Sequence, residues 1–136
     1  MNLPLQQRNQ SVPAMPFSLN PAISSNGLEA VMKGLGLNLP HDYKEFLLSS
    51  NGGEGLIGEN YIVFWRAEDL EPLNAGYEVA NFAPGFLLFG SDGGGEAYAF
   101  DTRKSPWEVV QIPFIGMDDP IARGSSFTEF CASLRA

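Results

Sequence analysis

Hydrophobic residues recur at helical spacing near the start of the chain. Four of them follow the i, i+3, i+4, i+7 pattern that lines one face of a helix: Leu28, Val31, Met32 and Leu35. Ser24 or Asn26 can cap the beginning of this helix, and Gly34 or Gly36 can end it. The pattern therefore predicts a helix whose apolar side packs on a core.

A second helix is predicted in residues 39–53, which read Leu-Pro-His-Asp-Tyr-Lys-Glu-Phe-Leu-Leu-Ser-Ser-Asn-Gly-Gly. Pro40 suits the first turn, where an N–H group would have no helical partner. The Asn-Gly-Gly run at 51–53 tolerates the left-handed conformation that ends a helix. Three residues between these ends share one face, which predicts a short helix docked on the core: Tyr43, Phe46 and Leu47.

A third helix is predicted at the end of the chain. Ser126 with Glu129 three residues later forms a capping-box pattern, in which each side chain satisfies a free backbone donor of the other residue. The apolar residues that follow lie on one face: Phe127, Phe130, Cys131 and Leu134. Cys131 is most simply a small buried hydrophobic residue.

Strand patterns fill the middle of the chain. Residues 61–65, Tyr-Ile-Val-Phe-Trp, form a dense β-branched and aromatic run, which predicts a strand buried on both faces. Residues 67–73 are expected to form a short helix limited by Pro72. Pro84 and Gly85 then fit the central positions of a type II turn.

Two more regions alternate with the period of a strand. Tyr98 and Phe100 alternate with alanines, and a later series repeats at every second position: Val110, Ile112 and Phe114. Strands grouped between helices, rather than strictly alternating with them, predict an α+β domain with a mostly antiparallel or mixed sheet. We expect this domain to span residues 23–136.

Residues 1–22 differ from the rest of the chain. This segment contains four prolines and carries Arg8 as its only charged residue. Closely spaced prolines remove backbone donors and fix backbone angles, so an extended arm is expected. It could be free, or it could dock through Phe17 and Leu19.

The charge of the chain is concentrated in its middle. The net charge is −8, but residues 45–101 hold ten acidic residues and Arg66 as their only base, which gives −9 for this stretch. A nucleic-acid partner is not expected, because the phosphate backbone would be repelled. A basic protein would instead be attracted and steered toward this region.

The chain lacks a long apolar run and a secretory leader pattern, so we expect a cytoplasmic protein with no membrane partner. With Cys131 as its only cysteine, the chain can form no internal disulfide.

No motif in the sequence indicates catalysis. The glycine-rich run at 90–95 lacks the Gly-Lys-Ser/Thr ending of a phosphate-binding loop, so a flexible hairpin connection is the simpler interpretation. The single histidine, His41, has no nucleophile motif beside it. A few acids around the glycine run could gather a hard cation, although the ligand spacing of a calcium loop is absent: Asp92, Glu96, Asp118 and Asp119. We therefore expect no enzyme activity and no cofactor.

The segment at 39–53 closely resembles a motif of the SUKH superfamily, the Smi/Knr type. The resemblance rests on a leucine-proline pair, an aromatic position and an Asn-Gly-Gly ending, and it continues loosely through residues 82–101 to the Pro-Phe-Ile-Gly stretch near residue 114. The motif residues, which we interpret as structural, are Leu39, Pro40, Tyr43, Phe46, Leu47, Asn51, Gly52 and Gly53. The resemblance implies an α+β domain without chemistry of its own.

Bacterial members of that superfamily are commonly immunity proteins that neutralise toxin domains, and fungal relatives regulate cell-wall synthesis. The resemblance and the charge together suggest a binding module that covers a basic toxin domain, such as a nuclease, with an acidic surface. The acids expected to bind lie beside glycines in predicted loops: Glu54, Glu59, Asp92 and Glu96. The alternatives are a housekeeping scaffold and a ligand- or metal-dependent enzyme that uses the glycine-rich loop.

Overall fold

The computed structural model describes residues 17–135, and the predictions for residues 1–16 lie outside this range. Within it, the helices and strands predicted from the hydrophobic patterns are present, together with elements that those patterns do not predict. The helical elements are α1 (Ser25–Leu35), α2 (His41–Ser49), η1 (Ala67–Asp69), α3 (Leu70–Gly76), α4 (Val79–Phe82) and α5 (Phe127–Leu134). The strands are β1 (Ser18–Leu19), β2 (Gly53–Ile57), β3 (Asn60–Phe64), β4 (Phe86–Ser91), β5 (Glu96–Asp101), β6 (Glu108–Pro113) and β7 (Ile121–Gly124).

The described strands form one seven-stranded sheet in sequence order, and every neighbouring pair is antiparallel. This meander confirms the predicted α+β class. β1 adds Ser18 and Leu19 to the edge of the sheet, so this part of the predicted arm is extended and docked. Phe17 packs on Phe64, whereas Leu19 remains 58% exposed.

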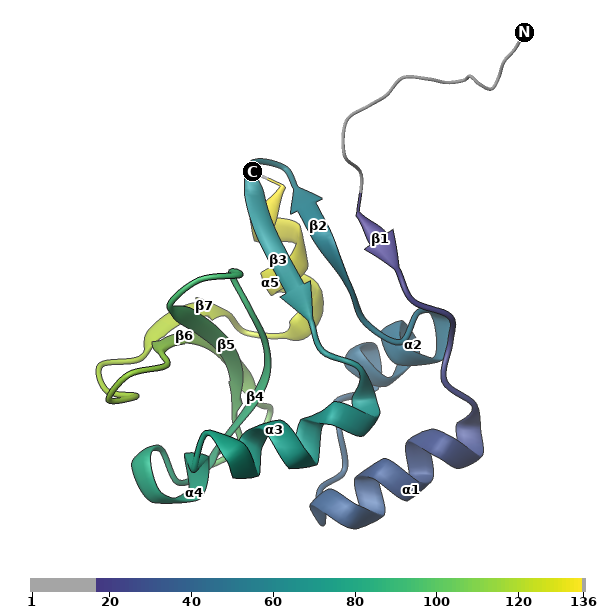
Figure 1. Ribbon diagram of the computed structural model, residues 1–136, viewed down its shortest axis with the longest axis horizontal. Coiled ribbons are helices and arrows are strands. Elements are labelled where there is room, and N and C mark those ends of the chain that lie inside the picture. Colours follow the sequence, from purple (N-terminus) through teal and green to yellow (C-terminus); the bar gives the residue numbers. More distant parts are fainter. Residues whose placement is uncertain (1–16, 136) are drawn as a thin grey trace, which may run out of the picture.

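The two faces of the sheet carry different cores. The larger core lies on the inner face, beneath α1, α2 and α5, and contains stacked and edge-on aromatic rings: Tyr43, Phe64, Phe89, Phe100, Phe127 and Phe130. A smaller core lies on the opposite, outer face of β4–β6. Figure 1 shows α5 behind the β2–β3 hairpin, and α3 with α4 along the lower part of the view.

The contact between β3 and β4 is short. These strands pair only at Val63–Ser91 and Phe64–Gly90, after which the Trp65 N–H donates to the Phe89 carbonyl. Asn74 of α3 then takes the place of a strand, because its side chain accepts from the Leu88 N–H and donates to the Leu88 carbonyl, each at 2.9 Å. The sheet thus divides into a β1–β3 part and a β4–β7 part.

The predicted ends of α1 and the predicted turn at Pro84 and Gly85 are confirmed. Ser24 caps α1 by accepting from the Gly27 N–H, and Gly36 ends it in the left-handed conformation. The Ala83 carbonyl accepts from the Phe86 N–H around a turn in which Gly85 has φ +90°, as a type II turn requires.

Four local predictions were wrong or incomplete. β3 is buried on one face only, because Tyr61 points outward and is 42% exposed. Pro72 does not limit its helix, since it lies in the first turn of α3, where its missing N–H costs little. Ser126 accepts from the Glu129 N–H as predicted, but the Glu129 carboxylate accepts from the Ser125 N–H instead of completing the capping box.

The fourth correction concerns the two ends of α2. This helix ends at Ser49, and Ser50 follows in extended conformation with its N–H bonded to the Phe46 carbonyl. Pro40 occupies the cap position, one residue before the helix, rather than the first turn. The Asn-Gly-Gly run is therefore not the helix stop itself but the connection from α2 to β2.

Candidate interaction surface

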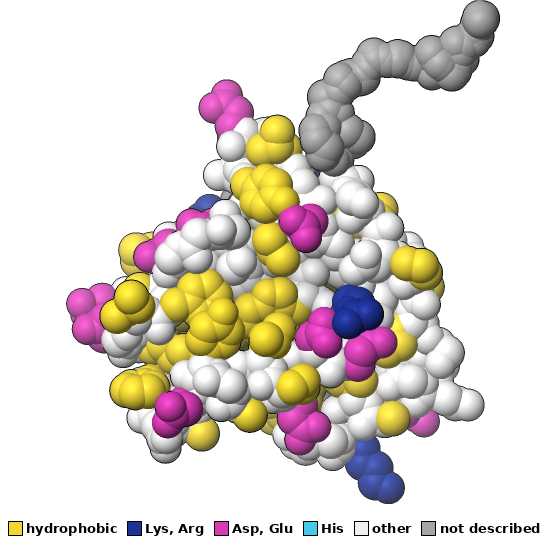
Figure 2. All heavy atoms as spheres, viewed as in Figure 1, with side chains coloured by type: hydrophobic (Ala, Val, Ile, Leu, Met, Phe, Trp, Pro, Cys, Tyr) yellow, Lys and Arg dark blue, Asp and Glu magenta, His cyan; other side chains and the backbone are white. Residues whose placement is uncertain are grey.

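The outward side of the β2–β3 hairpin is the most open part of the sheet. Strand alternation places five side chains on it, which we call the outer hairpin face: Glu54, Leu56, Tyr61, Val63 and Trp65. Glu54 pairs with Val63, and Leu56 pairs with Tyr61, in the register of the hairpin. Figure 1 shows β3 at the front with no described helix before it, and Figure 2 shows a band of hydrophobic side chains over this region.

Tyr61 connects this face to the glycine-rich loop. Its hydroxyl donates to the Glu54 carboxylate, and this hydrogen bond raises the pKa of Tyr61 above its ordinary value. Its ring lies against Gly93, where an added Cβ would come within 2.9 Å of the ring. Because its hydroxyl and its ring both contact other parts of the protein, Tyr61 loses less conformational freedom when a partner covers it.

An aromatic triad, consisting of Trp65, Tyr77 and Phe114, continues the face toward α3. The rings of Trp65 and Tyr77 are stacked at 6.2 Å and 6°, and those of Tyr77 and Phe114 lie 4.6 Å apart. Trp65 and Phe114 pack on the smaller core, while Tyr77 is 41% exposed. The triad therefore presents aromatic surface to solvent next to the outer hairpin face.

The acids expected to bind a partner do not all lie together. Glu54 lies on the outer hairpin face, and Glu59 is exposed in the turn that joins β2 to β3. Asp92 lies in the loop that contacts Tyr61. Glu96, in contrast, alternates with Ala97, which belongs to the outer core, so its side chain lies on the inner face.

Two of these acids also differ from their predicted setting. Glu54 belongs to β2 and Glu96 to β5, not to loops, because the glycine-flanked segments continue strand pairing. Glu96 accepts a hydrogen bond from Gln111, and Gln111 in turn accepts one from Arg123. A binding role for the four acids stays a prediction, but Glu54, Glu59 and Asp92 are the three placed around the hairpin.

The glycine-rich run is a hairpin connection between β4 and β5, as predicted, but its backbone is fixed by hydrogen bonds. Asp92 Oδ1 accepts from the Gly94 N–H at 2.7 Å and from the Glu96 N–H at 3.2 Å, and Ser91 Oγ accepts from the Gly93 N–H. Among the described residues, no three His, Cys, Asp or Glu side chains gather as a metal site would require.

Glu54 is the residue of the outer hairpin face that the sequence predicts as a binding residue, and Trp65 packs on the core. The sequence does not predict the exposure of Leu56 and Tyr61, because residues 61–65 have the pattern of a strand buried on both faces. The alternation of Gly53, Glu54, Gly55 and Leu56 was the available clue: small residues face the core while Glu54 and Leu56 face solvent.

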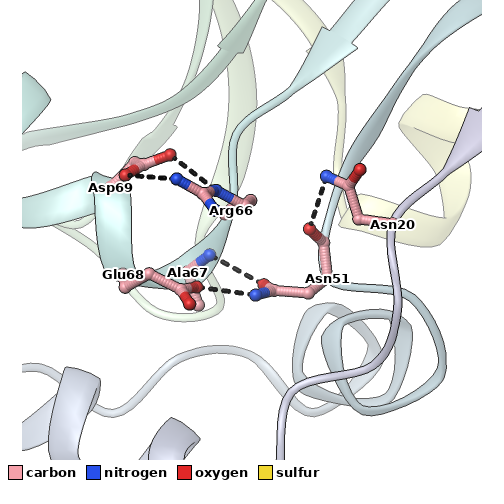
Figure 3. Close-up of polar contacts among 6 residues, drawn as sticks. All are labelled: Asn20, Asn51, Arg66, Ala67, Glu68 and Asp69. Carbon is pink, nitrogen blue, oxygen red and sulfur yellow. Dashed lines mark hydrogen bonds and ion pairs between the residues drawn. The ribbon is translucent and has the colours of Figure 1, made fainter.

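The motif residues at 39–53, in contrast, are mostly buried. Asn51 is 5% exposed, and its side chain accepts from the Ala67 N–H at 2.8 Å and donates to Glu68 at 2.6 Å (Figure 3). Its carbonyl accepts from the side chain of Asn20. Asn51 thus joins the end of α2 to η1 and to the segment after β1, and its hydrogen bond lowers the pKa of Glu68.

Each glycine that follows Asn51 has its own backbone requirement. Gly52 has φ +82°, and a Cβ there would lie 2.6 Å from the Phe64 carbonyl oxygen. Gly53 has φ +150°, and a Cβ there would lie even closer to the carbonyl oxygen of Ser18. A side chain at either position would strain the backbone and separate β2 from its neighbours.

A known family model matches most of this chain. The model of the SMI1/KNR4 family (SUKH-1) matches residues 22–133. The chain belongs to this family. The match confirms the resemblance predicted from the segment at 39–53, and members of the family are often immunity proteins.

A relative in Bacillus subtilis (strain 168), the uncharacterized protein YnaB, is 34% identical over 89 residues. The aligned part is 65% of this chain and 57% of YnaB, so the chain spans little more than half the length of that relative. Over residues 17–135, no helix is both long and apolar enough to cross a membrane.

The family motif has a structural basis in this chain. Leu39, Tyr43 and Leu47 are buried in the inner core, Phe46 packs against it, and the Asn-Gly-Gly run fixes the entry into β2. These residues therefore position the hairpin that carries the outer face, and they offer little surface to a partner.

Proposed function

We propose that this chain is a non-enzymatic immunity protein that binds a basic toxin domain and covers its active site. The observation that carries the proposal is the outer hairpin face, where exposed apolar and aromatic side chains adjoin carboxylates. Interfaces favour aromatic anchors that exclude water, and complementary charge raises the rate of encounter.

The distribution of charge supports a basic partner. Residues 45–101, with their net charge of −9, include β2, β3, the glycine-rich loop and α3. A toxin that acts on nucleic acid has a cleft suited to phosphate, and such a cleft would attract acidic side chains for the same reason. Occlusion of that cleft needs no catalytic group on the immunity protein.

The test begins with an affinity pull-down of the purified full chain from its source cells, at low salt and again at high salt. Proteins recovered at low salt are identified by mass, expressed alone to measure toxicity, and then co-expressed with this chain. We expect a basic protein that arrests growth, a salt-sensitive complex, and restored growth upon co-expression.

Two results would contradict the proposal. A stable complex with a regulator that is not toxic would favour the housekeeping scaffold. Restored growth without a physical complex would show that protection does not require binding. A thermal-shift screen with metals and small ligands covers the enzyme alternative, because a ligand that binds the native state raises its unfolding temperature.

A further inference from the structure

A groove of about 410 Å³ opens along the lower part of the outer hairpin face. It is formed by β1 and the residue after it, the start of β2, the end of β3, and η1 with the residues just before it. The residues that give it its chemical character are Ser18, Asn20, Glu54, Trp65, Arg66 and Asp69. The groove therefore combines a carboxylate from β2, a carboxylate from η1 and an indole ring.

Hydrogen-bonding capacity remains at both carboxylates. Glu54 accepts from the Tyr61 hydroxyl through one oxygen, and a carboxylate offers about four acceptor positions. Asp69 pairs with Arg66 at 3.1 Å, and the side chains of this pair are 55% and 36% exposed. Because such exposed pairs contribute little, an incoming cation can share Asp69 at small cost.

Figure 3 shows that Arg66 and Asp69 face each other on the side of η1 away from the Asn51 network. The charges within the groove are two carboxylates and one guanidinium, so its net charge is negative. The groove therefore offers a planar cation the carboxylates of Glu54 and Asp69 as acceptors and Trp65 as an aromatic surface.

This chemistry fits arginine better than other ligands. Guanidinium groups stack on aromatic faces and bind carboxylates through two parallel hydrogen bonds, whereas lysine acts as a point charge. Bases of single-stranded nucleic acid also stack on aromatic side chains, but the acidic middle of the chain would repel their phosphates.

We propose that this groove receives an arginine side chain from a basic protein partner, with the guanidinium against Trp65 and bonded to Glu54 and Asp69. The proposal rests on the proposed function, since the arginine would belong to the bound toxin domain. It identifies the chemical feature by which that partner is recognised.

The test is an NMR titration of the ¹⁵N-labelled full chain with the blocked peptide acetyl-Gly-Arg-Arg-Gly-amide. Two matched peptides replace arginine with citrulline, which is neutral and has the same shape, or with lysine. We expect salt-sensitive shifts for residues 54, 63 and 69 and for the Trp65 indole N–H. Citrulline should produce no shifts, and lysine should bind more weakly.

A charge-neutral variant locates the contact. Glu54→Gln should weaken arginine-peptide binding about two- to fivefold, as the loss of one exposed charge pair implies. Glu29→Gln removes the same charge from an exposed position on α1 and should leave binding unchanged. Thermal unfolding of both variants confirms that each is folded.

Shifts spread over acidic positions elsewhere, equal binding of the lysine peptide, or an unchanged affinity of Glu54→Gln would each overturn the arginine site. Failure of the groove and failure of the function are distinguishable. If Glu54→Gln neutralises a toxin as well as the wild type does, only the groove proposal fails. If the peptide binds the groove but no toxin is neutralised, only the immunity function fails.

Discussion

The segment at 39–53 and the outer hairpin face are adjacent in the chain but differ in their exposure to solvent. Asn51 is 5% exposed and bonded on three sides, whereas Tyr61, ten residues later, is 42% exposed. The first region carries the residues that reveal the family, and the second carries the surface proposed to bind.

This difference separates what defines the family from what selects a partner. Asn51 is required by the hydrogen bonds of its side chain, and the two glycines after it are required by backbone geometry, so any chain with this fold has reason to keep them. Leu56 and Tyr61 satisfy no buried group. They can therefore change without loss of the fold. Mutations in the segment at 39–53 should lower stability, whereas mutations on the outer hairpin face should lower binding and leave stability nearly unchanged.

The largest expected effect is that of Gly52→Ala. The new Cβ would lie 2.6 Å from the Phe64 carbonyl oxygen and 2.8 Å from that of Trp65, at a φ of +82°. We expect a loss of about 3 kcal/mol or more in the free energy of unfolding, from strain and overpacking together. Urea unfolding followed by circular dichroism measures it. Gly95→Ala, where a Cβ meets nothing within 4 Å, is the control and should change stability by less than about 0.5 kcal/mol.

Asn51→Ala should come next, with a loss of about 2 kcal/mol. It removes two side-chain hydrogen bonds and leaves the buried Ala67 N–H without its acceptor. The matched substitution Asn81→Ala removes a hydrogen bond to Glu78 on the surface and should cost little. Equal destabilisation by the two substitutions would refute the structural role of Asn51.

Tyr43→Phe should act in the opposite direction. The Tyr43 hydroxyl is buried and has no partner among the described residues, and burial raises the pKa of this side chain. Removal of the hydroxyl ends its desolvation cost while the ring contacts with Phe100 and Phe127 remain. We expect unchanged or higher stability, by up to about 1 kcal/mol. A loss of more than this amount would reveal a partner for the hydroxyl.

A smaller effect links Asn51 to pH. Its hydrogen bond lowers the pKa of Glu68 below the usual glutamate value of 4.5. The folded state thus prefers the charged form, so this stabilisation is present above pH 4.5 and is lost as the pH falls through the folded-state pKa. Glu68→Gln should remove this part of the acid sensitivity in urea titrations at several pH values. In an Asn51→Ala background the same substitution should change the acid sensitivity less.

The smallest effect on stability belongs to the outer hairpin face. Tyr61→Ala should leave the unfolding temperature nearly unchanged, because the ring is half exposed and its hydroxyl bonds an exposed carboxylate. Its effect should appear in binding, where loss of an aromatic anchor costs about 2 kcal/mol or more. Calorimetry with the captured toxin domain measures the affinity. A large fall in unfolding temperature would assign Tyr61 to the fold instead.

The sequence predicted the fold better than the surface, and the reasons are physical. Periodicity and caps identified α1, α2 and α5, because those patterns reflect local geometry and burial. The exposure of Tyr61 could not be predicted from the sequence. A β-rich segment has the same hydrophobic pattern whether one face of the strand or both faces are covered. Glu54 and Asp69 line the same groove because of the register between β2 and β3 and the turn that leads into η1. No local sequence pattern encodes either of these features.

The most direct test of the account compares neutralisation by three forms of the full chain at equal soluble amounts. Cells that express the captured toxin domain receive the wild type, Glu54→Gln/Tyr61→Ala, or Asn51→Ala, at a temperature where all three are folded. We predict that the wild type and Asn51→Ala restore growth and that the outer-face double variant does not. Full protection by the double variant would contradict the claim that this face binds the toxin.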